Sequence, residues 1–192
     1  MYRGEKIFQG TAAEAVVAYS EAVRQAAREA QESVPKEGGL SQRVMTFDAE
    51  IERVSLLSAE GQPVTVLQSG STAVLAVDVC FHKNVQQPVF AFAIRTSDGR
   101  LVYDTTTRWM NMQTPNFSAG ERCRVEYDID LPLLEGPYEL TVDVAASDLS
   151  HYYDRLERAM GFWVKSSDAA KGLVDLKANV AFKAIESNGV TA

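Results

Sequence analysis

The sequence predicts an all-β fold, an immunoglobulin-like antiparallel β-sandwich with an N-terminal amphipathic helix. Two observations predict the sandwich. Between about residues 43 and 166, apolar and polar side chains alternate with a period of two in several short runs, as in strands with one buried face. Turn residues separate these runs and no helical pattern intervenes, which favours a sandwich over a parallel α/β sheet.

The composition is that of a soluble globular chain of 192 residues with a net charge of −7, and 46% of its residues are hydrophobic. No apolar run approaches the roughly 18 residues that span a bilayer. The first ten residues lack the apolar core of a signal peptide, so we expect a protein that stays in the cytoplasm. The acidic balance and the lack of a Lys/Arg cluster argue against a nucleic-acid partner. Cys80 and Cys123 lie in alternating runs and are expected to be buried thiols.

The first 42 residues predict the amphipathic helix. Thr11 to Glu14 has the form of a capping box, which satisfies backbone donors at a helix start. Apolar residues then recur at helical spacing from Ala12 to Ala30. Most of them are alanines, which bury little area, so we expect this helix to pack on another element. Pro35 and Gly38–Gly39 end it and form a linker.

Eight strands are expected after the linker. The alternation is clearest in the run from Ala73 to Phe81. Asp98–Gly99 is the strongest hairpin signal in the chain, and Gly61–Pro63, Ala119–Gly120 and Glu135–Pro137 mark other turns. The expected strands are 44–57, 63–68, 71–82, 88–97, 100–106, 121–131, 137–148 and 158–165.

One more candidate strand follows, between Leu173 and Phe182. A strand beyond a complete sandwich needs an edge to pair with, and that edge can belong to a second copy of the chain. We therefore divide the chain into a segment 1–42, a sandwich domain 43–182 in which 167–182 is a candidate exchanged strand, and a tail 183–192 that is expected to be frayed.

Catalytic motifs are sparse. The sequence contains neither GxxxxGK[ST] nor GxGxxG, and its two histidines, His82 and His151, have no zinc-site spacing with other ligands. We therefore expect no cofactor and no metal. A cluster of Ser150, His151 and Asp148 leaves a hydrolytic triad open, although no serine has a nucleophile-elbow context. Asp128 and Asp130 alternate with core residues and are interpreted as part of a solvated face.

The outward faces of two strands are more informative. Strand 88–97 turns Ala91, Ala93 and Arg95 away from the core, and strand 137–148 turns Thr141 and Asp143 away from it. If these strands are neighbours, small residues form a shallow floor that carries Arg95 and Asp143. The alternative is an ordinary cross-strand ion pair of little energy. Alanines are unusual on a solvated sheet, so we expect something to lie against this floor.

Aromatic residues outside the predicted core point to a sugar ligand. Trp109 follows a strand, Trp163 points outward if its neighbours are core, and His151 and Tyr152 lie in a predicted loop. An aromatic ring can stack on the apolar face of a sugar while planar polar groups bind its hydroxyls. The alternative is that Trp109 anchors a loop and Trp163 covers a sheet edge.

Four segments resemble a known family, and together they cover most of the chain. They are Gly4–Tyr19, Asp98–Thr105 with its DG-x-x-V pattern, Leu131–Tyr138 with its G-x-Y ending, and Tyr153–Leu173 with its YD start. In order and spacing they resemble the C-terminal carbohydrate-binding domain of Wzt, the ATPase subunit of bacterial ABC transporters that export O-antigen polysaccharide.

The resemblance implies a non-catalytic sandwich that dimerises by exchanging its last strand. Such a domain recognises the modified non-reducing terminus of the polysaccharide and couples it to export. The partners implied are the O-antigen polysaccharide, a second copy of the chain and the transmembrane exporter subunit, at the inner face of the inner membrane. The chain then begins near the end of the ATPase domain and lacks its Walker motifs.

We expect no catalytic residues, and the resemblance transfers no binding residue by motif. The outward-face argument and the family's use of one sheet face for sugar instead give the candidate ligand-binding set Arg95, Tyr103, Trp109, Thr141, Asp143, His151, Tyr152 and Trp163. Two other functions stay open: a dimerisation sandwich that binds no glycan, and an enzyme that acts on the glycan through Asp143 or His151.

Overall fold

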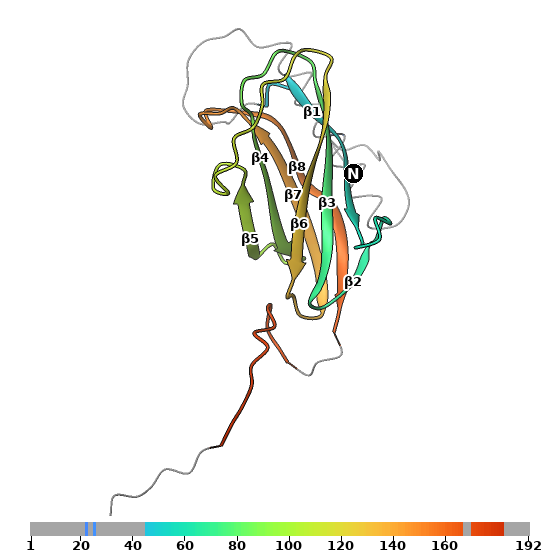
Figure 1. The fold of residues 1–192 in the computed structure, drawn as a ribbon. Helices are drawn as coiled ribbons and strands as arrows, with labels where there is room; N and C mark the ends of the chain where they lie inside the picture. The colour runs from blue at the N-terminus through green and yellow to red at the C-terminus, as the bar shows by residue number, and fades with distance from the viewer. Residues whose placement is uncertain (1–21, 23–24, 26–44, 167–169, 183–192) are drawn as a thin grey trace, which may run out of the picture.

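The computed structural model describes residues 45–166 and 170–182, together with Ala22 and Gln25, which are helical. The described chain forms two facing β-sheets (Figure 1), so the predicted sandwich is confirmed. The strands are β1 (Ala49–Leu57), β2 (Val66–Gln68), β3 (Ser71–Phe81), β4 (Val89–Thr96), β5 (Leu101–Thr106), β6 (Arg122–Leu131), β7 (Gly136–Ala145) and β8 (Tyr152–Lys165).

One sheet has three strands in the order β1-β3-β6, and all its pairs are antiparallel. The other has five strands in the order β2-β8-β7-β4-β5. Its β2–β8 pair is parallel, with Val66 opposite Trp163. The described strands therefore pair antiparallel, as predicted, except at this edge. The three residues of β2 are too few for an alternating pattern to indicate which strand they join or in which direction.

Side chains between the two sheets form the core. Phe81 stacks on Phe117 with ring centroids 4.1 Å apart, and Phe92 meets Tyr127 edge-on at 4.8 Å. The alternate residues of β4 and β7 that the sequence assigned to the core are buried: Phe90, Phe92, Ile94, Tyr138, Leu140, Val142 and Val144. Their neighbours in sequence must then face outward, and this fixes the outer face described below.

Two polar contacts tie the sandwich together. Asp154 on β8 is fully buried, and its carboxylate accepts the backbone N–H of Ile51 on β1 at 2.9 Å. Tyr138 donates its hydroxyl to the Leu134 carbonyl at 2.8 Å. This second contact resembles the tyrosine corner of immunoglobulin-like sandwiches.

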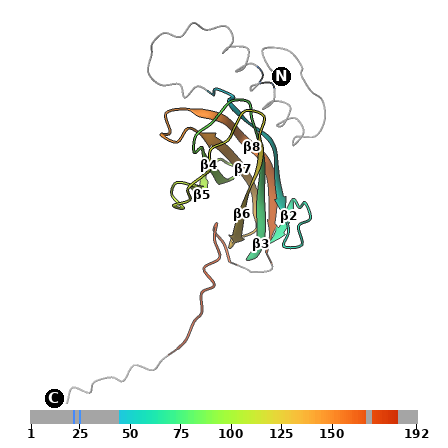
Figure 2. The ribbon, with the colours of Figure 1, turned by 45° about the horizontal axis from the view of Figure 1, so that its top comes forward.

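Two predicted segments lie outside the described residues: the helix, apart from Ala22 and Gln25, and the tail 183–192. Of the segment 167–182, residues 170–182 are described. Val174 forms a bridge with Leu133 after β6, and the chain then runs away from the sandwich in both views (Figure 2). Within the described part of the chain, no helix has the length and apolar character needed to cross a membrane.

Candidate functional site

The outer face of the five-stranded sheet has a floor of small side chains. β4 and β7 are neighbours, as the sequence analysis required, with Ala93 opposite Thr141 and Ala91 opposite Asp143. Ala91, Ala93 and Thr141 are all less than 9% exposed, although they point away from the core between the sheets. Because these side chains are short, larger side chains around them rise above the floor.

Three of those larger side chains meet at one end of the floor. Arg155 on β8 lies opposite Asp143, with 3.5 Å between its Nε and the carboxylate Oδ1. Its Nη1 donates to the Tyr152 hydroxyl at 3.3 Å, and its guanidinium carbon lies 5.3 Å from the centre of the Tyr152 ring. Burial lowers the pKa of Arg155, but Asp143, Tyr152 and Glu157 together outweigh burial and the net pKa is raised. The group is therefore a fixed positive charge beside a carboxylate and an aromatic ring.

The structure does not form the cross-strand pair of Arg95 with Asp143 that was the alternative for this floor. Arg95 lies opposite Glu139 rather than Asp143, and its Nη1 donates to the Gly99 carbonyl of the β4–β5 hairpin at 3.2 Å. The partner of Asp143 is Arg155, which the sequence analysis did not select. Tyr152, predicted in a loop, is the first residue of β8.

The connection between β7 and β8 does not have the arrangement of a serine nucleophile and its base. The Ser150 hydroxyl donates to the Asp148 carboxylate at 2.6 Å, and the same oxygen lies 3.0 Å from His151 Nδ1. The hydroxyl proton is thus directed to Asp148, so Nδ1 must donate to the serine oxygen rather than accept from it. The hydrogen bond from Ser150 holds the pKa of Asp148 below its usual value. Among the described residues, no group of three or more His, Cys, Asp or Glu could hold a metal ion.

The two tryptophans lie toward opposite ends of the outer face. Trp163 pairs with Pro137 at one end of β7 and is 43% exposed. Trp109 follows β5 beyond the level of Asp143 and is 63% exposed. Pro137 and Asp143 are six positions apart on β7, roughly 20 Å at the rise of a strand. The two rings therefore cannot stack on the same sugar unit.

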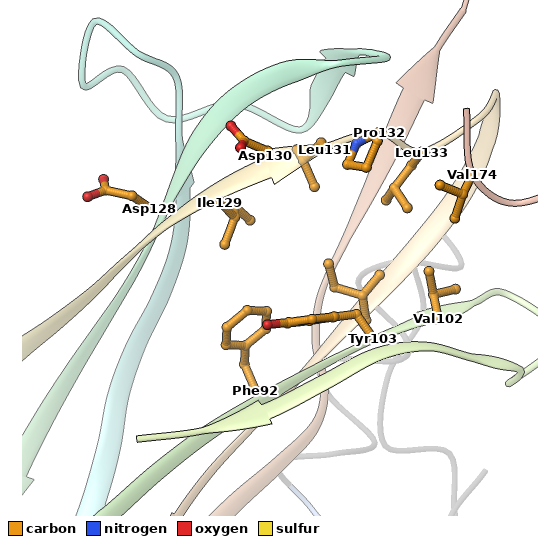
Figure 3. A pocket seen from close by; sticks show the side chains of 11 residues that line it. Phe92, Val102, Tyr103, Asp128, Ile129, Asp130, Leu131, Pro132, Leu133 and Val174 are labelled. Atoms are coloured by element: carbon orange, nitrogen blue, oxygen red, sulfur yellow. The ribbon is translucent and has the colours of Figure 1, made fainter. Parts of the chain in front are cut away.

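Tyr103 is the candidate that the structure separates from the others. Its ring lies 5.6 Å from that of Phe92, on the side of β5 that faces the opposite sheet. Tyr103 lines a mainly apolar cavity of about 310 Å³ between β5 and β6. Figure 3 shows Ile129 and Leu131 of β6 pointing into this cavity. The prediction placed Tyr103 with the outward-facing set. β5 pairs with β4 through a register shift next to Tyr103, which periodicity alone does not indicate.

Comparisons with known proteins identify the fold and the family. Residues 41–176 match the family model of the Wzt C-terminal domain. The crystal structure of the C-terminal domain of Wzt superimposes with a TM-score of 0.67 at 21% identity, over 78% of this chain and 90% of that one. No curated protein sequence matches.

Two further solved structures are less similar. An alkylpurine DNA glycosylase from Pseudomonas fluorescens has a TM-score of 0.40 at 13% identity, over 62% of this chain and 30% of its own. A CARDB domain from Pyrococcus furiosus has a TM-score of 0.39 at 12% identity, over 67% of this chain and all of its own. Neither bears on function.

Proposed function

Because the chain belongs to the Wzt C-terminal domain family, we propose that it is a non-catalytic carbohydrate-binding module of an O-antigen exporter. In this proposal the module recognises the modified non-reducing terminus of the polysaccharide and couples it to export. It works beside the transmembrane subunit, at the cytoplasmic side of the inner membrane.

The observation that carries the sugar-binding proposal is the outer face of the five-stranded sheet. Its floor consists of the short side chains of Ala91, Ala93 and Thr141, with larger side chains around them. Asp143 and Arg155 supply an acceptor and a donor beside that floor, and Tyr152 supplies a ring. Planar polar groups next to an aromatic ring can bind sugar hydroxyls and the apolar face of a sugar at the same time.

The Asp143→Asn variant tests the outer face. Loss of this carboxylate removes a charged acceptor and one of the two carboxylates that pair with Arg155, the other being Glu157 at 3.2 Å. We therefore expect the affinity for O-polysaccharide to fall about tenfold. The matched control is Asp78→Asn on the outer face of the other sheet, where Asp78 pairs with Arg124 at 2.6 Å. Isothermal titration should show normal binding by the control; equal affinities of the two variants would contradict the assignment.

The same proposal includes a dimer built by strand exchange. After the bridge between Val174 and Leu133, the chain continues with alternating apolar residues, and Leu176, Val180 and Phe182 are 84%, 81% and 95% exposed. β6 is an edge strand with one side unpaired by the other strands of its sheet, and the apolar cavity of Figure 3 lies beside it. If the tail of a second copy paired with this edge of β6, its apolar side chains would become buried and the edge would no longer be unpaired.

The double variant Val180→Ser/Phe182→Ser tests the exchange. It removes apolar area from one face of the tail, and we expect light scattering after size exclusion to report a monomer. The control Lys177→Ser/Asn179→Ser alters the opposite face and should remain a dimer. A monomeric wild-type chain, or a dimeric apolar variant, would refute the exchanged tail.

A further inference from the structure

A second cavity, of about 310 Å³, lies at the end of the outer face. We infer that it is a subsite for a sugar unit that carries an anionic group, either a carboxylate or a phosphate ester. This inference rests on the proposed function and specifies the ligand of the same face. The cavity lies between the turn after β5, residues 107–114, and Ser147 in the β7–β8 connection. Its volume is near the lower end, about 300 Å³, of the range for small-molecule sites.

The 107–114 turn is fixed at both ends. The Thr107 backbone N–H donates to the Phe90 carbonyl at 2.8 Å, and the Thr107 hydroxyl accepts the Phe90 N–H at 3.2 Å. At the other end, the Thr114 hydroxyl donates to the Pro88 carbonyl at 2.7 Å. Within the turn, Met112 donates its N–H to the Thr107 carbonyl at 2.8 Å. The cavity wall is therefore preorganised, and little ordering cost opposes binding.

The charge of the cavity favours an anion. Among the described residues that line it, Arg108 is the only charged side chain, and the other polar groups include the amides of Gln87, Asn111 and Gln113. Arg108 Nη1 donates to the Ser147 carbonyl at 3.3 Å, which fixes the guanidinium in the cavity wall. A guanidinium has five N–H donors, so several are left for a ligand. Its planar fork matches the oxygens of a carboxylate or a phosphate.

The surroundings favour a sugar as the carrier of that anion. The same turn presents Trp109 and Met112, which are 63% and 62% exposed, beside the polar lining. The cavity also adjoins the proposed glycan face, because its lining residue Val89 pairs with Ala145, which in turn pairs with Tyr152. A glycan lying on the outer face can thus place one anionic unit against Arg108.

The test is an amide-resolved NMR titration of the full chain with D-glucuronate, D-glucose 6-phosphate, D-glucose and inorganic phosphate. We expect the amide resonances of residues 107–114 and of Ser147 to shift with at least one anionic sugar. The chain should bind that sugar about tenfold more tightly than it binds glucose. Comparing the affinity for glucuronate with the affinity for glucose 6-phosphate shows whether the subsite prefers a carboxylate or a phosphate ester. Inorganic phosphate that binds as tightly as both anionic sugars would overturn the sugar assignment.

Arg108→Gln should abolish the preference for the anionic sugar. The matched control is Arg100→Gln, an exposed arginine of the β4–β5 hairpin that pairs with Asp98, and it should bind like the wild type. No shift in the turn with any probe, or an unchanged preference in Arg108→Gln, would overturn the inference.

The titration separates this inference from the proposed function. If the wild-type chain binds O-polysaccharide and Arg108→Gln binds it equally well, the subsite is wrong and the module stands. If anionic sugars bind at Arg108 but the polysaccharide does not bind, the module is wrong and the subsite stands.

Discussion

At the scale of single residues, Arg155 organises the candidate site. It connects Asp143 on β7 to Tyr152 on its own strand, and so holds a charge pair and an aromatic ring in one arrangement. The sequence predicted the outward position of Asp143 from simple alternation. It did not predict Arg155, because the buried carboxylate of Asp154 next to it interrupts the apolar pattern on which strand prediction depends.

Cys123 gives a prediction at the same scale. Its side chain faces the core, and burial raises the pKa of the thiol to about 11. The thiolate is the reactive form, so at pH 8 only about one thiol in a thousand is reactive. We expect mass spectrometry to find Cys123 unmodified after iodoacetamide treatment of the native protein at pH 8, with the rate rising toward pH 11. Unfolded protein should react readily, and rapid labelling of the native thiol would contradict its burial.

At the scale of elements, the connection between β6 and β7 is held by Tyr138. Its hydroxyl donates to the Leu134 carbonyl, and both residues are buried. We expect Tyr138→Phe to lower the free energy of unfolding by about 1–2 kcal/mol in a urea titration, because the carbonyl loses its partner. Tyr103→Phe is the matched control, since its ring is half exposed, and it should change stability by less than about 0.5 kcal/mol. Equal losses in the two variants would show that the hydroxyl of Tyr138 has no special role.

The strands themselves were largely predictable, and the exceptions have local causes. Eight ranges from alternation and turn residues correspond to eight strands, because each strand of a two-layer sandwich has one buried face. β8 begins at Tyr152, six residues before its predicted start at 158. A bulge between Leu156 and Met160 inserts extra residues opposite β7, and this breaks the period of two. The cavity at the 107–114 turn was not predicted, because a turn has no periodicity to read.

At the scale of the whole molecule, the proposed ligand face and the proposed assembly edge are different surfaces. The proposed glycan face lies on the outside of the five-stranded sheet, whereas the tail bridges to the chain just after β6, at the edge of the other sheet. In this arrangement a dimer can form while both glycan faces stay open. The variant that dissociates the dimer should therefore retain the intrinsic affinity of each chain for the glycan.

The most direct measurement is isothermal titration of the chain with O-polysaccharide from its own source strain, in parallel with the same polymer after removal of its non-reducing end. The proposed function predicts saturable binding to the intact polymer, with the polymer recovered unchanged, and no binding to the shortened one. Equal binding to both would contradict recognition of the terminus. Binding to neither by a folded chain would contradict the carbohydrate-binding module and leave a sandwich that serves assembly alone.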